Sequence, residues 1–243
     1  TNRSIMEAIA ALAEKYKAPV YMHASETESE VQDCIGRYGM TPTALFEQLG
    51  LWNYGGGAFH SVWVSNEDLH IYKKHGVYAV LNAGSNAKLA SGIAPVEKML
   101  QMGIPLAVGT DGPSSNNALD MFREMFLVTG LAKYRDMDAA STDAIEVLKM
   151  ATVNGAKAMG LTDSDVLAPG KYADLIMIDM HQPNMQPINN IAKNIVYSGS
   201  KQNVKMTMID GKILYEDGKF FIGEDPEKLY AKANEIADRL RQE

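Results

Sequence analysis

The feature that most constrains the fold is a repeated alternation between an amphipathic helical segment and a short apolar run. This alternation occurs four times in the first 108 residues. The helical segments are predicted at 4–17, 41–49, 66–75 and 93–102, and the apolar runs at 20–23, 58–64, 77–81 and 104–108. Continuous apolar runs of this length are typical of strands that are buried on both faces of a parallel sheet. The first part of the chain is therefore predicted to be an α/β structure with helices covering the sheet.

The texture of the sequence changes in its second half. Two longer helices are predicted at 119–133 and 142–159, and short β segments follow from Gly170. The dipeptide Asp210-Gly211 between two apolar runs indicates a β-hairpin. An apolar stripe across 225–243 predicts a terminal amphipathic helix. These changes divide the chain into an α/β part at 1–165, a small β part at 166–224 and the helix at 225–243.

Composition and charge exclude several classes of function. Lys and Arg number 23 against 30 Asp and Glu, for a formal charge of −7, and no basic block occurs. Nucleic-acid binding is therefore not expected. The apolar content of 46% is that of a chain with a large core. One cysteine forms no internal disulfide, and neither a membrane span nor a signal peptide is visible, so a cytoplasmic protein is expected.

Ionisable side chains gather at the predicted ends of the strands. His23 ends the first strand, Glu26 follows three residues later, His60 lies in or at the end of the second strand, and Asp111 follows the fourth. The carboxyl ends of neighbouring parallel strands meet on one open face. Two imidazoles and two carboxylates on such a face suit a divalent metal and proton transfer.

Each of these residues also has a purely structural interpretation. A histidine at a strand end is often a satisfied core residue, and Asp111 could simply cap the next helix. The remaining histidines, at 70, 75 and 181, are predicted to lie on the surface. Cys34 lies in a helix-like stretch and is interpreted as a packing residue.

Longer phrases around these residues resemble a known family. They are His23–Thr27, Phe59–Trp63, Ser85–Val96, Gly109–Asn117, Met150–Ala156 and Gly170–Ile176. The sequence resembles the amidohydrolase superfamily, and within it the 5'-methylthioadenosine/S-adenosylhomocysteine deaminase branch. This resemblance implies a (β/α)8 barrel with a small β-sandwich, hydrolytic deamination of a purine ring and a single divalent metal, zinc in the first place, with Fe²⁺ or Mn²⁺ as alternatives.

The resemblance also implies roles for individual residues. His23 and Asp111 match metal ligands, and Asp111 also matches the acceptor of the proton from water. Glu26 matches the acid that protonates the purine ring, and His60 matches the residue that orients the attacking hydroxide. Glu26, Asp111 and Ser115 are the expected contacts to a purine nucleoside substrate.

One family element is missing from the sequence. No His-x-His, the family's first metal pair, occurs in the chain, and only four βα units precede the β segment. The expected fold is therefore the carboxyl-terminal half of the barrel, a small β-sandwich segment and a terminal helix, with the amino-terminal half or a second copy as partner. Two alternatives stay open: a catalytically silent half-barrel, and another amidohydrolase such as a guanine or cytosine deaminase or a chlorohydrolase.

Overall fold

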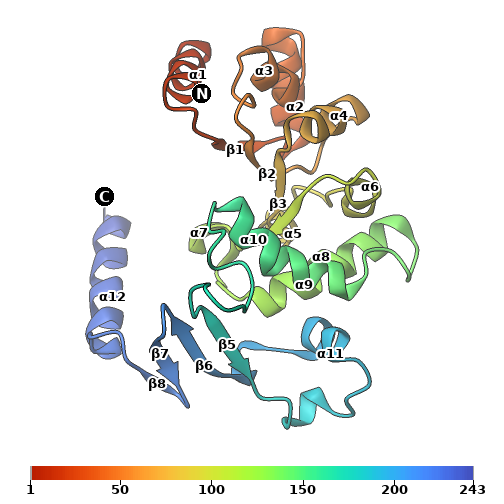
Figure 1. Ribbon diagram of the computed structural model, residues 1–243. Helices are drawn as coiled ribbons and strands as arrows, with labels where there is room; N and C mark the ends of the chain where they lie inside the picture. Colours follow the sequence, from red (N-terminus) through yellow and green to blue (C-terminus); the bar gives the residue numbers. More distant parts are fainter. Residues whose placement is uncertain (1, 243) are drawn as a thin grey trace.

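A computed structural model describes residues 2–242, and its first half contains the parallel sheet that the alternation predicts (Figure 1). The strands are β1 (Val20–Ala24), β2 (Gly56–His60), β3 (Tyr78–Leu81) and β4 (Leu106–Val108). They pair in parallel in the order β1-β2-β3-β4. In this register, His23 lies opposite Phe59 and Ala24 lies opposite His60. The two histidines of the predicted site are therefore neighbours on adjacent strands.

Helices connect the strands, and polar caps define where several of them begin. They are α1 (Arg3–Tyr16), α2 (Glu28–Tyr38), α3 (Pro42–Gln48), α4 (Asn66–His75), α5 (Ala83–Lys88), α6 (Val96–Gln101), α7 (Pro113–Asn116) and α8 (Met121–Asp136). The side chains of Thr27, Thr41 and Ser65 each accept a hydrogen bond from a backbone amide in the first turn of the helix that follows. Gly39 and Gly76 end α2 and α4 in the left-handed conformation. These residues are common helix signals, and they fix the loops between strands and helices.

The main core lies between one face of the parallel sheet and the helices. Ala24, Ala58 and Leu106 contribute from the strands. Trp52, which follows α3, and Tyr72, in α4, are fully buried and pack edge to face. Burial raises the pKa of Tyr72 to about 12. The small strand residues let the helices approach the sheet closely, so this face is sealed by helix packing.

The opposite face of the sheet is only partly covered, which corrects the expectation that all four strands are buried on both faces. In β1, Tyr21 and His23 are exposed while Ala24 is buried. An apolar hollow of about 460 Å³ lies over this face, lined in part by Tyr21, Phe59, Val80 and Ala107. We call these four side chains the open face. The continuous apolar run of β1 concealed an alternation between a helix-packed side and this open side.

Several predicted boundaries differ from those of the structure. The second strand spans Gly56–His60, and the chain leaves the sheet directly after His60 instead of continuing to residue 64. The helix predicted at 93–102 begins only at Val96, after Pro95. The helix predicted at 142–159 is two helices, α9 (Ala144–Ala151) and α10 (Val153–Ala158), because Thr152 has φ −125° and ψ −99°. Such a backbone conformation interrupts the helical hydrogen bonds.

The second half contains an antiparallel sheet with strands in the order β5 (Leu175–Ile178), β6 (Val204–Ile209), β7 (Lys212–Glu216) and β8 (Lys219–Phe220). Asp210 and Gly211, with φ of 49° and 73°, form the predicted hairpin turn. Between β5 and β6 lie η1 (Pro183–Met185), α11 (Ile191–Ser198) and η2 (Lys201–Asn203). Residues 2–242 thus contribute one antiparallel sheet to this region.

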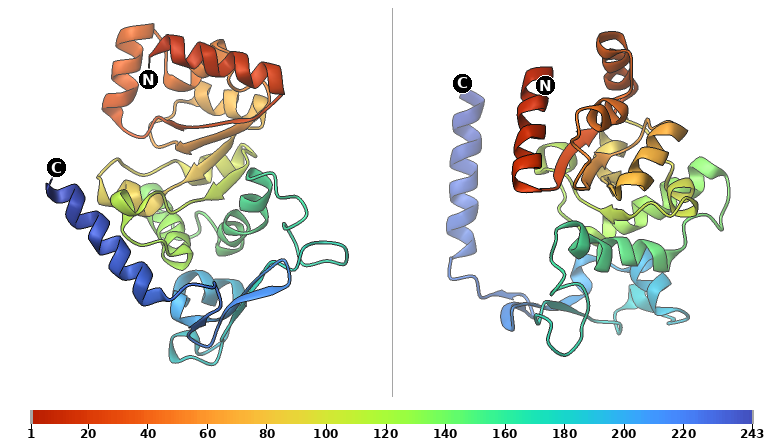
Figure 2. Two further views of the ribbon diagram at one scale, coloured as in Figure 1. Left: turned by 90° about the vertical axis from the view of Figure 1, so that its left-hand side faces the viewer. Right: turned by 45° about the horizontal axis from the view of Figure 1, so that its top comes forward.

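The chain ends in the predicted helix, α12 (Pro226–Gln242), which stands apart from the rest of the molecule (Figure 2). No residue of this helix is buried, and its apolar residues Leu229 and Leu240 are exposed. Every helix within residues 2–242 is too short or too polar to cross a membrane.

Candidate functional site

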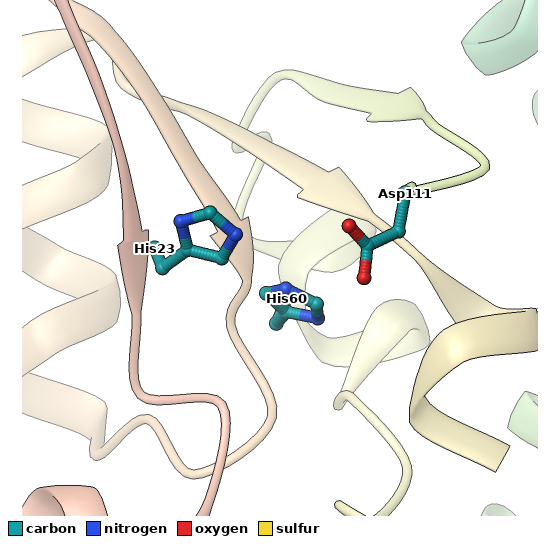
Figure 3. A group of neighbouring side chains, drawn as sticks. All are labelled: His23, His60 and Asp111. Carbon is teal, nitrogen blue, oxygen red and sulfur yellow. The ribbon is translucent and has the colours of Figure 1, made fainter. Parts of the chain in front are cut away.

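The carboxyl ends of β1 and β2 and the loop after β4 bring together three of the predicted residues. His23 lies in β1, His60 ends β2 and Asp111 lies three residues beyond the end of β4 (Figure 3). One possible ligand atom from each of the three lies within 4.8 Å of the other two. The rings of His23 and His60 stack with their centroids 5.2 Å apart. Residues almost 90 positions apart in sequence thus share one small volume at the carboxyl edge of the sheet.

His60 is held in one orientation with one nitrogen free. Its ring is 1% exposed, and Nδ1 lies 2.7 Å from Oδ1 of Asn86. Because an amide oxygen only accepts hydrogen bonds, Nδ1 carries the proton in this arrangement. The lone pair of a neutral ring is then on Nε2, which is buried and has no hydrogen-bond partner among residues 2–242. A buried, unpaired nitrogen is costly unless another group binds it.

Asp111 is held by three hydrogen bonds. Its Oδ2 accepts from Ser85 Oγ at 2.6 Å and from Ser115 Oγ at 2.7 Å, and its Oδ1 accepts from the Gly112 amide at 2.7 Å. Burial alone would raise the pKa of Asp111, but these bonds and the nearby His60 together lower it below its ordinary value. The carboxylate form of Asp111 is therefore favoured, as a metal ligand or a proton acceptor requires.

Glu26 lies beside this cluster and is held by its own set of contacts. Its Oε2 is 3.7 Å from His60 Nε2, and Ser91 Oγ donates a hydrogen bond of 3.3 Å to its Oε1. The carboxylate of Glu30, in α2, accepts from the amides of Ser25 at 3.1 Å and Glu26 at 2.7 Å. The side chain of Glu26 is 24% exposed, so it borders the cluster while remaining open to a small molecule.

The donor set fits a divalent metal. Two imidazoles and one carboxylate are ligands that zinc accepts, and a catalytic zinc commonly has three protein ligands and an open position. The unpaired Nε2 of His60 would gain the partner that it lacks. The hydrogen bonds of Asn86 to His60 and of Ser85 to Asp111 are of the kind that orient metal ligands.

The other histidines and the cysteine lie outside this cluster. His70 and His181 are exposed, as predicted. The prediction for His75 is wrong: its side chain is 16% exposed, and Nε2 lies 3.0 Å from Oε1 of Glu47. A hydrogen bond from Lys74, and to a smaller extent one from His75, lowers the pKa of Glu47. Cys34 packs against the core, and burial raises its pKa, which disfavours the nucleophilic thiolate.

Sequence reasoning missed four residues that support the site: Glu30, Ser85, Asn86 and Ser91. Ser85 and Asn86 follow β3, so the rule that selected the ends of the other strands could have found them. Glu30 and Ser91 carried no such signal. Glu30 reads as an ordinary first-turn helix residue, and Ser91 lies in the loop between α5 and α6.

A parallel sheet with a His/His/Asp cluster at its carboxyl edge defines an α/β protein with a candidate metal centre. The sequence profile of the amidohydrolase family matches residues 1–214. The chain therefore belongs to the amidohydrolase family.

Two curated relatives are similar to this chain over most of its length. The chain is 38% identical over 218 residues to a 5-methylthioadenosine/S-adenosylhomocysteine deaminase of Thermococcus onnurineus, a match that covers 90% of this chain and 51% of the relative. It is 37% identical over 224 residues to a 5'-deoxyadenosine deaminase of Methanothermobacter thermautotrophicus, with 92% and 52% covered. The chain thus spans about half the length of the curated relatives that it matches.

A solved structure agrees with this placement. The crystal structure of an adenosine deaminase from Xanthomonas campestris with bound zinc superposes with a TM-score of 0.94 at 34% sequence identity. The superposition covers 100% of this chain and 55% of the other. The similarity includes both sheets and the terminal helix.

Proposed function

We propose that this chain carries part of the active site of a metal-dependent deaminase that hydrolyses the amino group of a purine nucleoside of the 5'-methylthioadenosine or S-adenosylhomocysteine type. The observation that carries the proposal is the position of Glu26, with Oε2 at 3.7 Å from His60 Nε2, next to the cluster of His23, His60 and Asp111. An acid, a base and a metal-ligand set in one place are what hydrolysis of an amino-substituted ring requires. The names of the relatives support the choice of a nucleoside.

His23 and Asp111 would hold the metal, with His60 available as a third ligand. A bound zinc ion supplies a water of lowered pKa, near neutrality, as the nucleophile. Zinc is the first choice because a similar adenosine deaminase contains it, and Fe²⁺ or Mn²⁺ are alternatives with compatible ligands.

The side chains of this chain account for the proton transfers. Asp111 accepts a proton from the attacking water as the new bond to the ring carbon forms. Where His60 does not bind the metal, its Nε2 accepts a hydrogen bond from the attacking water, in the ring orientation that Asn86 fixes. Glu26 donates a proton to the adjacent ring nitrogen. The proton that Asp111 accepted from water then passes to the amino group, the bond between carbon and nitrogen breaks, and ammonia leaves. The hydroxyl group on the ring carbon returns its proton to Glu26 as the carbonyl forms. Ser115, together with Glu26 and Asp111, contacts the substrate.

The proposed architecture is the carboxyl-terminal half of a (β/α)8 barrel at 1–165, a β-sandwich portion at 166–224 and the helix at 225–243. The open face of Tyr21, Phe59, Val80 and Ala107 then belongs to the barrel interior. We infer that an amino-terminal half, or a second copy of this chain, completes the barrel and supplies the remaining metal ligands. A single cysteine is compatible with the cytoplasm as the site of action.

An assay of ammonia release by the full-length product of the gene tests this proposal. Methylthioadenosine, S-adenosylhomocysteine and 5'-deoxyadenosine would be compared with guanine, cytosine and a chlorinated triazine. Chloride release replaces ammonia release as the readout for the triazine, and zinc content would be measured in parallel. Wild-type protein should deaminate a nucleoside, and His23→Ala and Asp111→Ala should lose both zinc and turnover. His181→Ala, which changes an exposed histidine, should retain both.

Two results would favour the alternatives. Preference for guanine, cytosine or the triazine would indicate a different amidohydrolase activity. Absence of turnover on all six compounds by zinc-loaded protein would favour the catalytically silent half-barrel.

A further inference from the structure

Two carboxylate side chains in residues 2–242 are buried: Asp68, which is 1% exposed, and Glu124, which is 0% exposed. Asp68 belongs to the capping box of α4 and accepts a hydrogen bond from Thr41. Glu124 lies in the first turn of α8, but it accepts no hydrogen bond from that helix. Within residues 2–242, it also makes no ion pair with a Lys or Arg. Burying a carboxyl group without a cation is costly, so its contacts must compensate.

Those contacts join two elements that flank the candidate site. Glu124 Oε2 accepts from the amide of Gly84, in α5, at 2.8 Å. Its Oε1 accepts from Asn116 Nδ2, in α7, also at 2.8 Å. The packing at Gly84 is tight, since a Cβ there would lie 2.3 Å from Glu124 Oε1. Asn116 Nδ2 also donates to the carbonyl of Thr110 at 2.6 Å. One carboxyl group thus fixes the beginning of α5 and, through Asn116, the loop after β4.

Both elements hold residues of the proposed metal site. The two residues after Gly84 in α5 are Ser85, which donates to Asp111, and Asn86, which accepts from His60. Thr110 directly precedes Asp111 in the loop that Asn116 holds. A shift of α5 or α7 would therefore change the orientation of both His60 and Asp111.

We propose that Glu124 is a positioning residue of the active site, which acts on metal affinity and turnover through α5 and α7. The expected effect on turnover rests on the proposed function. The expected effect on zinc affinity rests only on the cluster of His23, His60 and Asp111. Both oxygens of Glu124 accept from N–H donors on different elements. A glutamine in its place would present an NH₂ group to one of those donors and could satisfy only the other.

Zinc affinity and steady-state kinetics of the protein as its gene expresses it would test this role. Glu124→Gln should bind zinc about 10- to 100-fold more weakly, the range found when groups that orient metal ligands are changed. Its kcat should fall by a similar factor while KM changes less. Asp68→Asn is the matched control, because it alters an equally buried carboxyl group whose donors, Thr41 Oγ1 and the Ser65 amide, are not residues of the site. It should lower the melting temperature without changing zinc affinity.

Coupling to Ser85 separates positioning from general destabilisation. If Glu124 acts through α5, the double variant Glu124→Gln/Ser85→Ala should lose much less than the product of the two single effects. Should Glu124→Gln fail to fold, Asn116→Ala removes one of the two contacts and should weaken zinc binding in the same direction.

A folded Glu124→Gln protein with wild-type zinc affinity and kcat, and only a lowered melting temperature, would overturn the inference. Wild-type protein that binds zinc but deaminates no nucleoside would instead count against the proposed function. The zinc comparison would remain decisive for Glu124 in that case, because it needs no substrate.

Discussion

Replacing Glu26 by glutamine is the most direct test of the proposed chemistry. The substitution preserves the size of a side chain that is 24% exposed and that Ser91 contacts, but it removes the acid that would protonate the ring. A positioned general acid contributes about 10²- to 10⁴-fold to a rate. That factor corresponds to roughly 3–5 kcal/mol in the activation barrier. Glu26 is outside the cluster of ligand atoms formed by His23, His60 and Asp111, so zinc content should be unchanged.

Ammonia release and metal analysis on the same preparation would measure both effects. Glu28→Gln provides the control, because Glu28 is an exposed carboxylate two residues away in the first turn of α2. It should leave zinc content and rate at wild-type levels. A Glu26→Gln protein with its rate within tenfold of wild type would refute the assignment of Glu26 as the proton donor. Loss of zinc from this variant would show that Glu26 supports the metal site instead.

Three further predictions concern stability and association. Gly56→Ala should destabilise the protein by about 1–3 kcal/mol in urea denaturation, because its Cβ would lie 1.9 Å from the Val20 carbonyl oxygen; Gly36→Ala, where nothing lies within 4 Å, should be neutral or stabilising. Glu47 has a lowered pKa and stabilises the fold above its unfolded pKa of about 4.3, an effect lost as pH falls through the folded pKa. Glu47→Gln should therefore cost roughly 0.2–1 kcal/mol at neutral pH and nothing at pH about 2. The purified 243-residue chain should self-associate in light scattering through its open face, whereas a monodisperse 26.6 kDa monomer would contradict that.

The parallel sheet could be predicted because each strand is a short apolar run after an amphipathic helix. Asp210-Gly211 likewise indicated the hairpin, because these residues tolerate the left-handed conformation that its turn requires. The break at Thr152 was not predicted, because apolar residues continue from α9 into α10 at Val153, Ala156 and Ala158. The dipeptide Asn154-Gly155 was the local signal against one continuous helix. Hydrophobic periodicity reports which residues are buried, and it does not report whether the backbone between them stays helical.

The part of the candidate site that lies at strand ends could be predicted, because reactive residues of parallel α/β proteins gather at the carboxyl ends of strands. His23, His60 and Asp111 follow from that rule, and the structure brings them together. Ser85 and Asn86, which hydrogen-bond Asp111 and His60, belong to α5, a helix of six residues without an amphipathic stripe. Short polar helices resemble loops in sequence, so their contribution becomes visible only when the strands are placed in space.

The backbone at the site shows why residue types alone were insufficient. Ser25, His60, Ser61 and Asp111 have φ of 55°, 74°, 50° and 59°, in the left-handed region that glycine normally occupies. A non-glycine residue in this conformation destabilises the fold by about 1–3 kcal/mol. Because glycine occupies none of these four positions, the sequence gives no sign of the left-handed turns. The left-handed turn at His60 and Ser61 ends β2 and coincides with the inward placement of the His60 ring, which a continued strand to residue 64 would not allow. Tertiary contacts must offset this local strain, among them the Asn86 bond to His60 and the three bonds to Asp111. The same contacts hold the proposed metal ligands in place. A substitution that removes one of these contacts should therefore both destabilise the strained loop and change the orientation of a metal ligand.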